Sequence, residues 1–102
     1  MALLMEIVRI WTDTRKYSLT ASLDGNELVL AGHDLSPGLE ELFGRDEYEY
    51  WYRTDVAAVV AVLGEPILER VRDLLAAHGI SASTIWKEWL IAHGIRYQFS
   101  NY

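Results

Sequence analysis

The side chains of this sequence that are best suited to chemistry are several carboxylates and one histidine near the middle of the chain. Asp46, Glu47 and Glu49 could act with His33 in acid and base catalysis, provided that their surroundings push the pKa values of neighbouring groups apart. Their spacing along the chain does not place them in one cleft. No nucleophile elbow surrounds a serine and no glycine-rich phosphate loop occurs, so the sequence predicts no catalytic residue.

Negative charge is concentrated in the same stretch of sequence. Six acids lie between residues 34 and 49 against one base, Arg45, and together they supply −5 of the net charge of −6. One interpretation is a solvated loop beside a strand with an exposed polar face. The other is an acidic docking surface for a basic protein. Tyrosine, tryptophan and arginine, which are enriched at interface anchors, lie beside the acids in residues 48–53. The predicted protein-binding residues are then Glu40, Glu41, Asp46, Glu47, Glu49, Trp51 and Arg53.

Two further functions remain open at the level of the sequence. A small-ligand or enzymatic pocket with aromatic walls would be lined by Trp11, His33, Tyr50 and Trp51. The aromatic strand expected at residues 47–53 could instead associate with a second copy of the chain, which would make the protein a homodimer.

The composition argues against several classes of partner. The pI of about 4.9 and the lack of a basic stripe argue against binding to nucleic acid or to an anionic membrane. The chain has no cysteine, which excludes disulfides and thiolate metal sites and suits a cytoplasmic protein. The apolar run at residues 1–5 is too short for a signal peptide, and no segment approaches the roughly 20 apolar residues of a membrane span. We expect no cofactor.

Two segments of the second half, residues 70–80 and 85–95, resemble one another and share an Ala-His-Gly-Ile ending. A metal site formed by His78 and His93 would need the two ends to converge and a third ligand to join them, so no metal site is predicted. The better interpretation is a helix C-terminus in each copy, with Gly79 and Gly94 in a left-handed conformation just past the helix. The following isoleucine would then pack on the last turn.

The hydrophobic pattern defines the elements that position these residues. Alternating patterns predict strands at 5–11, 17–23, 27–33, 47–53 and 95–99, with the first of them an inner strand because both of its alternating sets are apolar. Asp55 can cap a helix over 56–63 that Gly64 ends, and Pro66 can open another helix as far as His78. Ser81 or Ser83 can cap a third helix to His93, with an apolar stripe at Ile85, Trp89 and Ala92, flanked by Trp86 and Leu90.

These elements predict a single α+β domain over residues 1–102. Its sheet would have four or five mainly antiparallel strands: an N-terminal meander of three strands, an aromatic fourth strand and a C-terminal strand. Two or three helices would pack on one face. A non-enzymatic protein-binding module of this class, such as an inhibitor or an immunity protein, is the favoured function.

The segment Glu47-Tyr-Glu-Tyr-Trp51 with Asp55, and the segment from Trp89 to Tyr97 that carries His-Gly-Ile, resemble a family of small uncharacterised bacterial proteins. The resemblance covers most of the chain. Its motifs are structural, namely an aromatic strand, a helix stop and a final strand. It therefore implies the same architecture and carries over no activity.

Overall fold

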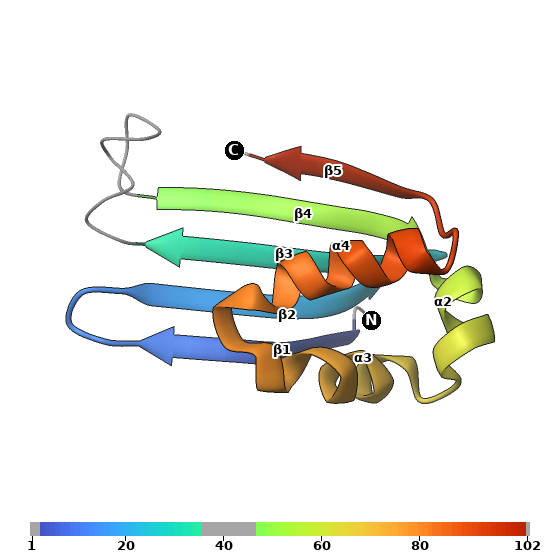
Figure 1. The fold of residues 1–102 in the computed structure, drawn as a ribbon, viewed down its shortest axis with the longest axis horizontal. Coiled ribbons are helices and arrows are strands. Elements are labelled where there is room, and N and C mark those ends of the chain that lie inside the picture. Colours follow the sequence, from blue (N-terminus) through green and yellow to red (C-terminus); the bar gives the residue numbers. More distant parts are fainter. Residues whose placement is uncertain (1–2, 36–46, 102) are drawn as a thin grey trace.

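The computed structural model describes residues 3–35 and 47–101, which form one antiparallel sheet with helices (Figure 1). The strands are β1 (Leu3–Trp11), β2 (Lys16–Asp24), β3 (Glu27–Leu35), β4 (Glu47–Asp55) and β5 (Tyr97–Asn101). The helices are α2 (Val56–Leu63), α3 (Ile67–Leu75) and α4 (Ala82–Ala92), and a 3₁₀ helix, η1 (Ala76–Ser81), joins α3 to α4. The predicted α+β class and antiparallel sheet are confirmed.

The five strands lie in their order along the chain, β1-β2-β3-β4-β5, so β1 and β5 are the edges of the sheet. Figure 1 shows α3 and α4 lying across one face of the sheet, while α2 lies at the end of the strands. The opposite face carries no described helix. This division into a covered face and an open face decides which side chains of each strand are accessible.

The alternation in β2 shows how the core is built. Tyr17, Leu19 and Ala21 are buried, whereas Lys16 is exposed and the residues between are partly exposed. Because successive side chains of a strand point to opposite faces, one set packs under the helices and the other faces the open side. Across the tight turn at Gly25, where φ is 60°, β3 continues the same register.

β1 is an edge strand, so the prediction of an inner strand is wrong. Its register against β2 shifts between Glu6 and Val8, which marks a β-bulge at Ile7. Ile7 and Val8 are both buried, each 7% exposed. Before the bulge Met5 packs against the core, and after it Ile10 does. Both alternating sets are apolar because the bulge exchanges the set that faces the helices.

Helix α2 begins and ends where the sequence predicts. The Asp55 carboxylate accepts a hydrogen bond from the Ala58 N–H at 3.2 Å, which satisfies one free donor of the first turn. Gly64 follows the helix with a φ of 82°, and its N–H donates to the Val60 carbonyl. Local signals alone define this helix.

The two copies of the repeated helix ending have different structures. At the second, Gly94 has a φ of 67°, and its N–H donates to the Ile91 carbonyl at 3.1 Å. The Ile95 N–H donates to the Leu90 carbonyl at 2.9 Å. These two bonds are those of a Schellman motif, and His93 occupies the C-cap as predicted.

The first copy does not form this motif, so the prediction is wrong there. Helix α3 ends at Leu75, and His78 and Gly79 lie in the 3₁₀ helix that runs directly into α4. Gly79 has a φ of 56° and a ψ of −128°, which kinks the chain between the two helices. Ile80 is 47% exposed instead of packing on the last turn. Gly79 therefore lies in a connection between two helices, whereas Gly94 lies between a helix and a strand.

The buried face of α4 is centred on Ala82, Trp86 and Leu90, which are fully enclosed. Of the predicted stripe, Ile85 and Trp89 pack against the core and the flanking Trp86 and Leu90 are buried, whereas Ala92 is exposed. Trp89 stacks on Trp86, with ring centroids 5.3 Å apart. Ser81 occupies the N-cap, but its side chain makes no capping hydrogen bond. Ser83 lies inside the helix, so neither serine caps α4 as predicted.

The tightest approach between β3 and β4 is at Gly32, which pairs with Tyr50 across the strands. A Cβ atom at Gly32 would overlap the phenol ring of Tyr50. Gly32 is not among the glycines with positive φ, so the requirement for glycine here is the space that the ring occupies.

We expect Gly32→Ala to lower the free energy of unfolding by about 1–3 kcal/mol, the usual cost of overpacking a core. The measurement is urea unfolding at equilibrium. In a Tyr50→Ala background the same substitution should cost much less, because the ring that it would strike is gone. An equal cost in both backgrounds would show that the ring is not the obstacle.

Candidate functional site on the open sheet face

The two faces of β4 are chemically different. Tyr50 and Tyr52 point under the helical layer and are buried. The alternate set faces the open side and is partly exposed, and it consists of Glu47, Glu49, Trp51 and Arg53. Four of the predicted protein-binding residues therefore share one accessible face. The other three, Glu40, Glu41 and Asp46, lie outside the described residues.

Trp51 occupies the middle of this face. It pairs with Ala31 on β3 and with Ser100 on β5. Neither neighbour is large, so the indole keeps part of its surface accessible to solvent. A partly exposed tryptophan between small residues provides a broad apolar surface of the kind that anchors interfaces.

Arg53 lies beside two carboxylates at the far end of β4. Its Nη1 atom is 3.6 Å from Asp24 Oδ2 and 3.8 Å from Glu27 Oε1. Exposed ion pairs of this length contribute about 0–1 kcal/mol to stability. The carboxylates of Asp24 and Glu27 thus balance the positive charge of Arg53. Glu47 and Glu49 then leave this face with a net negative charge.

His33 lies between Glu47 and Glu49 at the other end of the face. It pairs directly with Glu49 in the register of β3 and β4, and Glu47 is the diagonal neighbour. The Nε2 atom is 3.3 Å from Glu47 Oε1 and 3.7 Å from Glu49 Oε1. Three of the four residues predicted for acid and base chemistry are therefore adjacent and half-exposed on the open face of the sheet, and the fourth, Asp46, lies outside the described residues.

The four residues of the alternative aromatic pocket do not line one cavity. Tyr50 is buried under the helices, whereas His33 and Trp51 face the open side of the sheet. Trp11 is on β1, an edge strand separated from β4 by β2 and β3. The sheet itself separates the members of the set, so the predicted pocket is not assembled.

Trp11 belongs instead to a cluster at the surface of β1 and β2. Its side chain is 58% exposed. Arg9 approaches the ring at 4.9 Å and Lys16 at 5.2 Å, both within the range of cation–π contacts. Arg9 also donates from Nε to Glu6 at 2.9 Å. The side chains of Arg9 and Lys16 therefore both contact the indole of Trp11.

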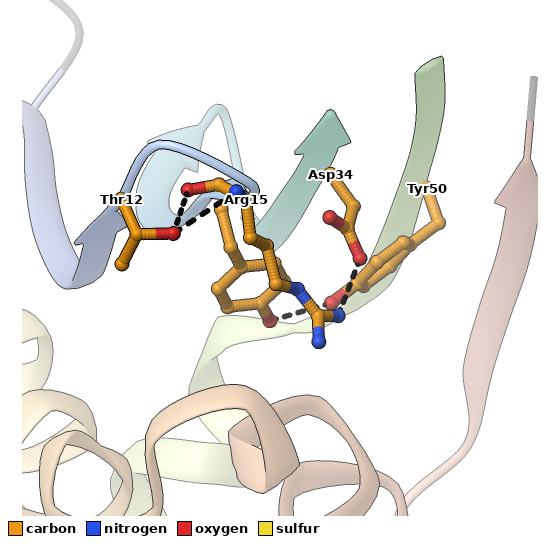
Figure 2. Close-up of polar contacts among 5 residues, drawn as sticks. Thr12, Arg15, Asp34 and Tyr50 are labelled. Carbon is orange, nitrogen blue, oxygen red and sulfur yellow. Dashed lines mark hydrogen bonds and ion pairs between the residues drawn. The ribbon is translucent and has the colours of Figure 1, made fainter. Parts of the chain in front are cut away.

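A polar network that the sequence did not predict lies on the covered face (Figure 2). The hydroxyls of Tyr17 and Tyr50 are hydrogen-bonded at 2.8 Å. Beside them Arg15 Nη2 donates to Asp34 Oδ2 at 2.7 Å, with the Asp34 side chain only 12% exposed. Alternation indicates that both tyrosines point inward, but their pairing depends on the register of three strands.

Burial raises the pKa of Tyr50 well above its usual value, and a hydrogen bond with Ser83 only partly offsets this effect. Burial likewise raises the pKa of Tyr17, again opposed by its hydrogen bonds with Tyr50 and Ser83. Both phenols therefore stay protonated at neutral pH and are unsuited to act as bases. The network contributes to the structure of the core.

The described residues line at least two open hollows beside the helical layer. The larger, about 300 Å³, lies between the start of β1 and the start of α3. Its lining is mainly apolar and includes Leu4, Met5, Leu23, Pro66, Ile67 and Leu68. The smaller, about 180 Å³, is lined by Tyr52, Lys87, Tyr97 and Phe99. Neither hollow contains a residue of the predicted aromatic pocket.

No family model, curated protein or solved structure matches this chain. Within residues 3–35 and 47–101, no helix has the length and apolar character needed to cross a membrane. The resemblance to a family of small bacterial proteins stays a prediction, and the function has to be inferred from the residues of the open face.

The buried tyrosines predict a pH dependence of stability. Above pH about 10, tyrosines of the unfolded chain ionise whereas Tyr50 in the folded protein keeps its proton, so stability is lost as the pH rises. Each such tyrosine contributes a slope of about 1.4 kcal/mol per pH unit. We expect Tyr50→Phe to flatten this alkaline fall, as measured by urea unfolding between about pH 9 and 11.

Val59→Ala is the control for this experiment, because it removes buried apolar volume and no titratable group. It should lower stability at every pH and leave the slope unchanged. A slope that stays the same in Tyr50→Phe would show that the phenol ionises as readily in the folded protein as in the unfolded chain.

Proposed function

We propose that this protein is a non-enzymatic protein-binding module that docks a basic partner through the open face of β4. The single observation that carries the proposal is the composition of that face, on which Glu47, Glu49 and Trp51 alternate with the buried Tyr50 and Tyr52 of the covered face. Acids around an accessible aromatic residue suit a charged, anchored interface.

The charge of the chain supports a basic partner. The net charge is −6, and two of the acids on the face are partly exposed, with side-chain exposures of 39% for Glu47 and 33% for Glu49. Complementary charge accelerates association and makes its rate depend on salt. Inhibitors and immunity proteins that block a basic surface use this kind of recognition, and we assign the protein to that functional class.

The rigidity of the strands supports the same function. Glu47, Glu49, Trp51 and Arg53 are all paired with β3, and Trp51 and Arg53 are also paired with β5. A surface held in a paired strand loses little conformational freedom on binding, which lowers the entropic cost of association. Such a face is suited to rigid docking.

Self-association is a second candidate, and the edges of the sheet favour it. β5 is an edge strand, and Phe99 on it is 47% exposed. Edge strands carry unpaired backbone groups that a second copy can complete. Sedimentation over a range of concentrations separates the two candidates, because a homodimer through β5 dissociates on dilution and a docking module stays monomeric without its partner.

The charge reversal Glu47→Lys with Glu49→Lys should abolish or strongly weaken capture of the partner, because it replaces acids of the face with bases. The experiment is capture by the immobilised protein from the lysate of its source cells, followed by quantitative mass spectrometry. Binding by the wild-type protein should also fall as salt is raised, since screening shortens the reach of charges to about 8 Å at physiological ionic strength.

The matched control is Glu69→Lys with Glu88→Lys, which makes the same change of charge on α3 and α4. Both of these glutamates are exposed. This variant should retain the partner. Equal loss in the two double variants would assign the effect to net charge, and equal retention would contradict docking through β4. Circular dichroism establishes that each variant is folded.

A further inference from the structure

The open face carries a set of potential metal ligands at the end of β3 and the start of β4. The imidazole of His33 and the carboxylates of Glu47 and Glu49 each offer one ligand atom, and these atoms all lie within 4.8 Å of one another. We propose that His33, Glu47 and Glu49 bind a divalent transition-metal ion, of which Zn²⁺ is the representative. This goes beyond the proposed docking function and does not depend on it.

The distances suit a shared ion. Ligand atoms about 2.1 Å from a tetrahedral zinc ion are about 3.4 Å apart. In the structure His33 Nε2 is 3.3 Å from Glu47 Oε1 and 3.7 Å from Glu49 Oε1. Both distances are close to this spacing.

The second observation concerns the Nε2 atom itself. It is shielded from solvent and, among the described residues, makes no hydrogen bond, although Glu47 Oε1 lies close to it. A shielded nitrogen that has two carboxylates beside it but no hydrogen bond is incompletely satisfied, and native structures seldom leave a buried polar atom in this state. An ion held between the imidazole and the two carboxylates would satisfy this nitrogen as a ligand.

The donor types select the class of metal. One imidazole nitrogen and two carboxylate oxygens suit zinc and related first-row ions, whereas Mg²⁺ and Ca²⁺ prefer oxygen ligands throughout. Two carboxylates also balance the double positive charge of the ion. Because His33 and Glu49 are direct partners in the ladder between β3 and β4, the strand register holds the two ligands together before the ion arrives.

The test is isothermal titration of Zn²⁺ into the purified full chain, without a polyhistidine tag and after treatment with EDTA. The wild-type protein should bind one ion per chain. His33→Gln and Glu49→Gln should each weaken binding by at least about tenfold, the lower end of the loss seen when an outer partner of a metal ligand is removed. Mg²⁺ at the same concentrations should give no binding heat.

The control is His93→Gln, since His93 lies at the end of α4 and its Nδ1 is 2.9 Å from the Trp89 carbonyl. This variant should bind Zn²⁺ as the wild-type protein does. Absence of Zn²⁺ binding by the folded wild-type protein would overturn the proposal, as would equal binding by His33→Gln and the wild type. Since the titration uses the chain alone, its result is separate from the capture of a protein partner.

Discussion

The pairing of β3 with β4 is the constraint on which both faces of the molecule depend. The two strands pair without a break from Glu27 opposite Asp55 to Leu35 opposite Glu47. On the covered face this register places the Tyr50 ring over Gly32, and on the open face it places His33 beside Glu49. A slip of one residue would move every side chain to the other face, exposing the tyrosines and burying the acids. Packing and candidate site are therefore specified by the same pairing.

The two faces deal with polar groups in opposite ways. Beneath the helices the phenols of Tyr17 and Tyr50 bond to each other and stay neutral, because burial penalises their charged forms. On the open face the carboxylates of Glu47 and Glu49 are partly exposed, and water lowers the cost of their charge. A sheet with helices on one side thus keeps its buried phenols neutral and presents a charged face to the solvent. The proposed docking and metal-binding functions both use this second face.

The repeated helix endings show how far local sequence reaches. The second copy, with Gly94, forms the predicted Schellman motif because the chain then leaves the helix for β5. In the first copy the chain must enter α4 within a few residues of the end of α3, so Gly79 kinks a 3₁₀ connection instead. Both glycines adopt positive φ, as expected, yet the hydrogen bonds around them differ. A glycine permits a conformation, and the next element along the chain decides which one is used.

The sequence by itself determined the strands, in which apolar and polar side chains alternate. It also determined the start and end of α2, the end of α4 and the two chemically distinct faces of β4. These features follow from the alternation of side chains and from caps whose partners lie within a few residues. Only the tertiary structure decided that β1 is a bulged edge strand, that Tyr17 meets Tyr50, that His33 lies between Glu47 and Glu49, and that Trp11 and Tyr50 cannot share a pocket. The physical reason is that local sequence encodes dihedral preference and periodicity, whereas these contacts depend on strand order and register, which are set by packing between residues far apart in the chain.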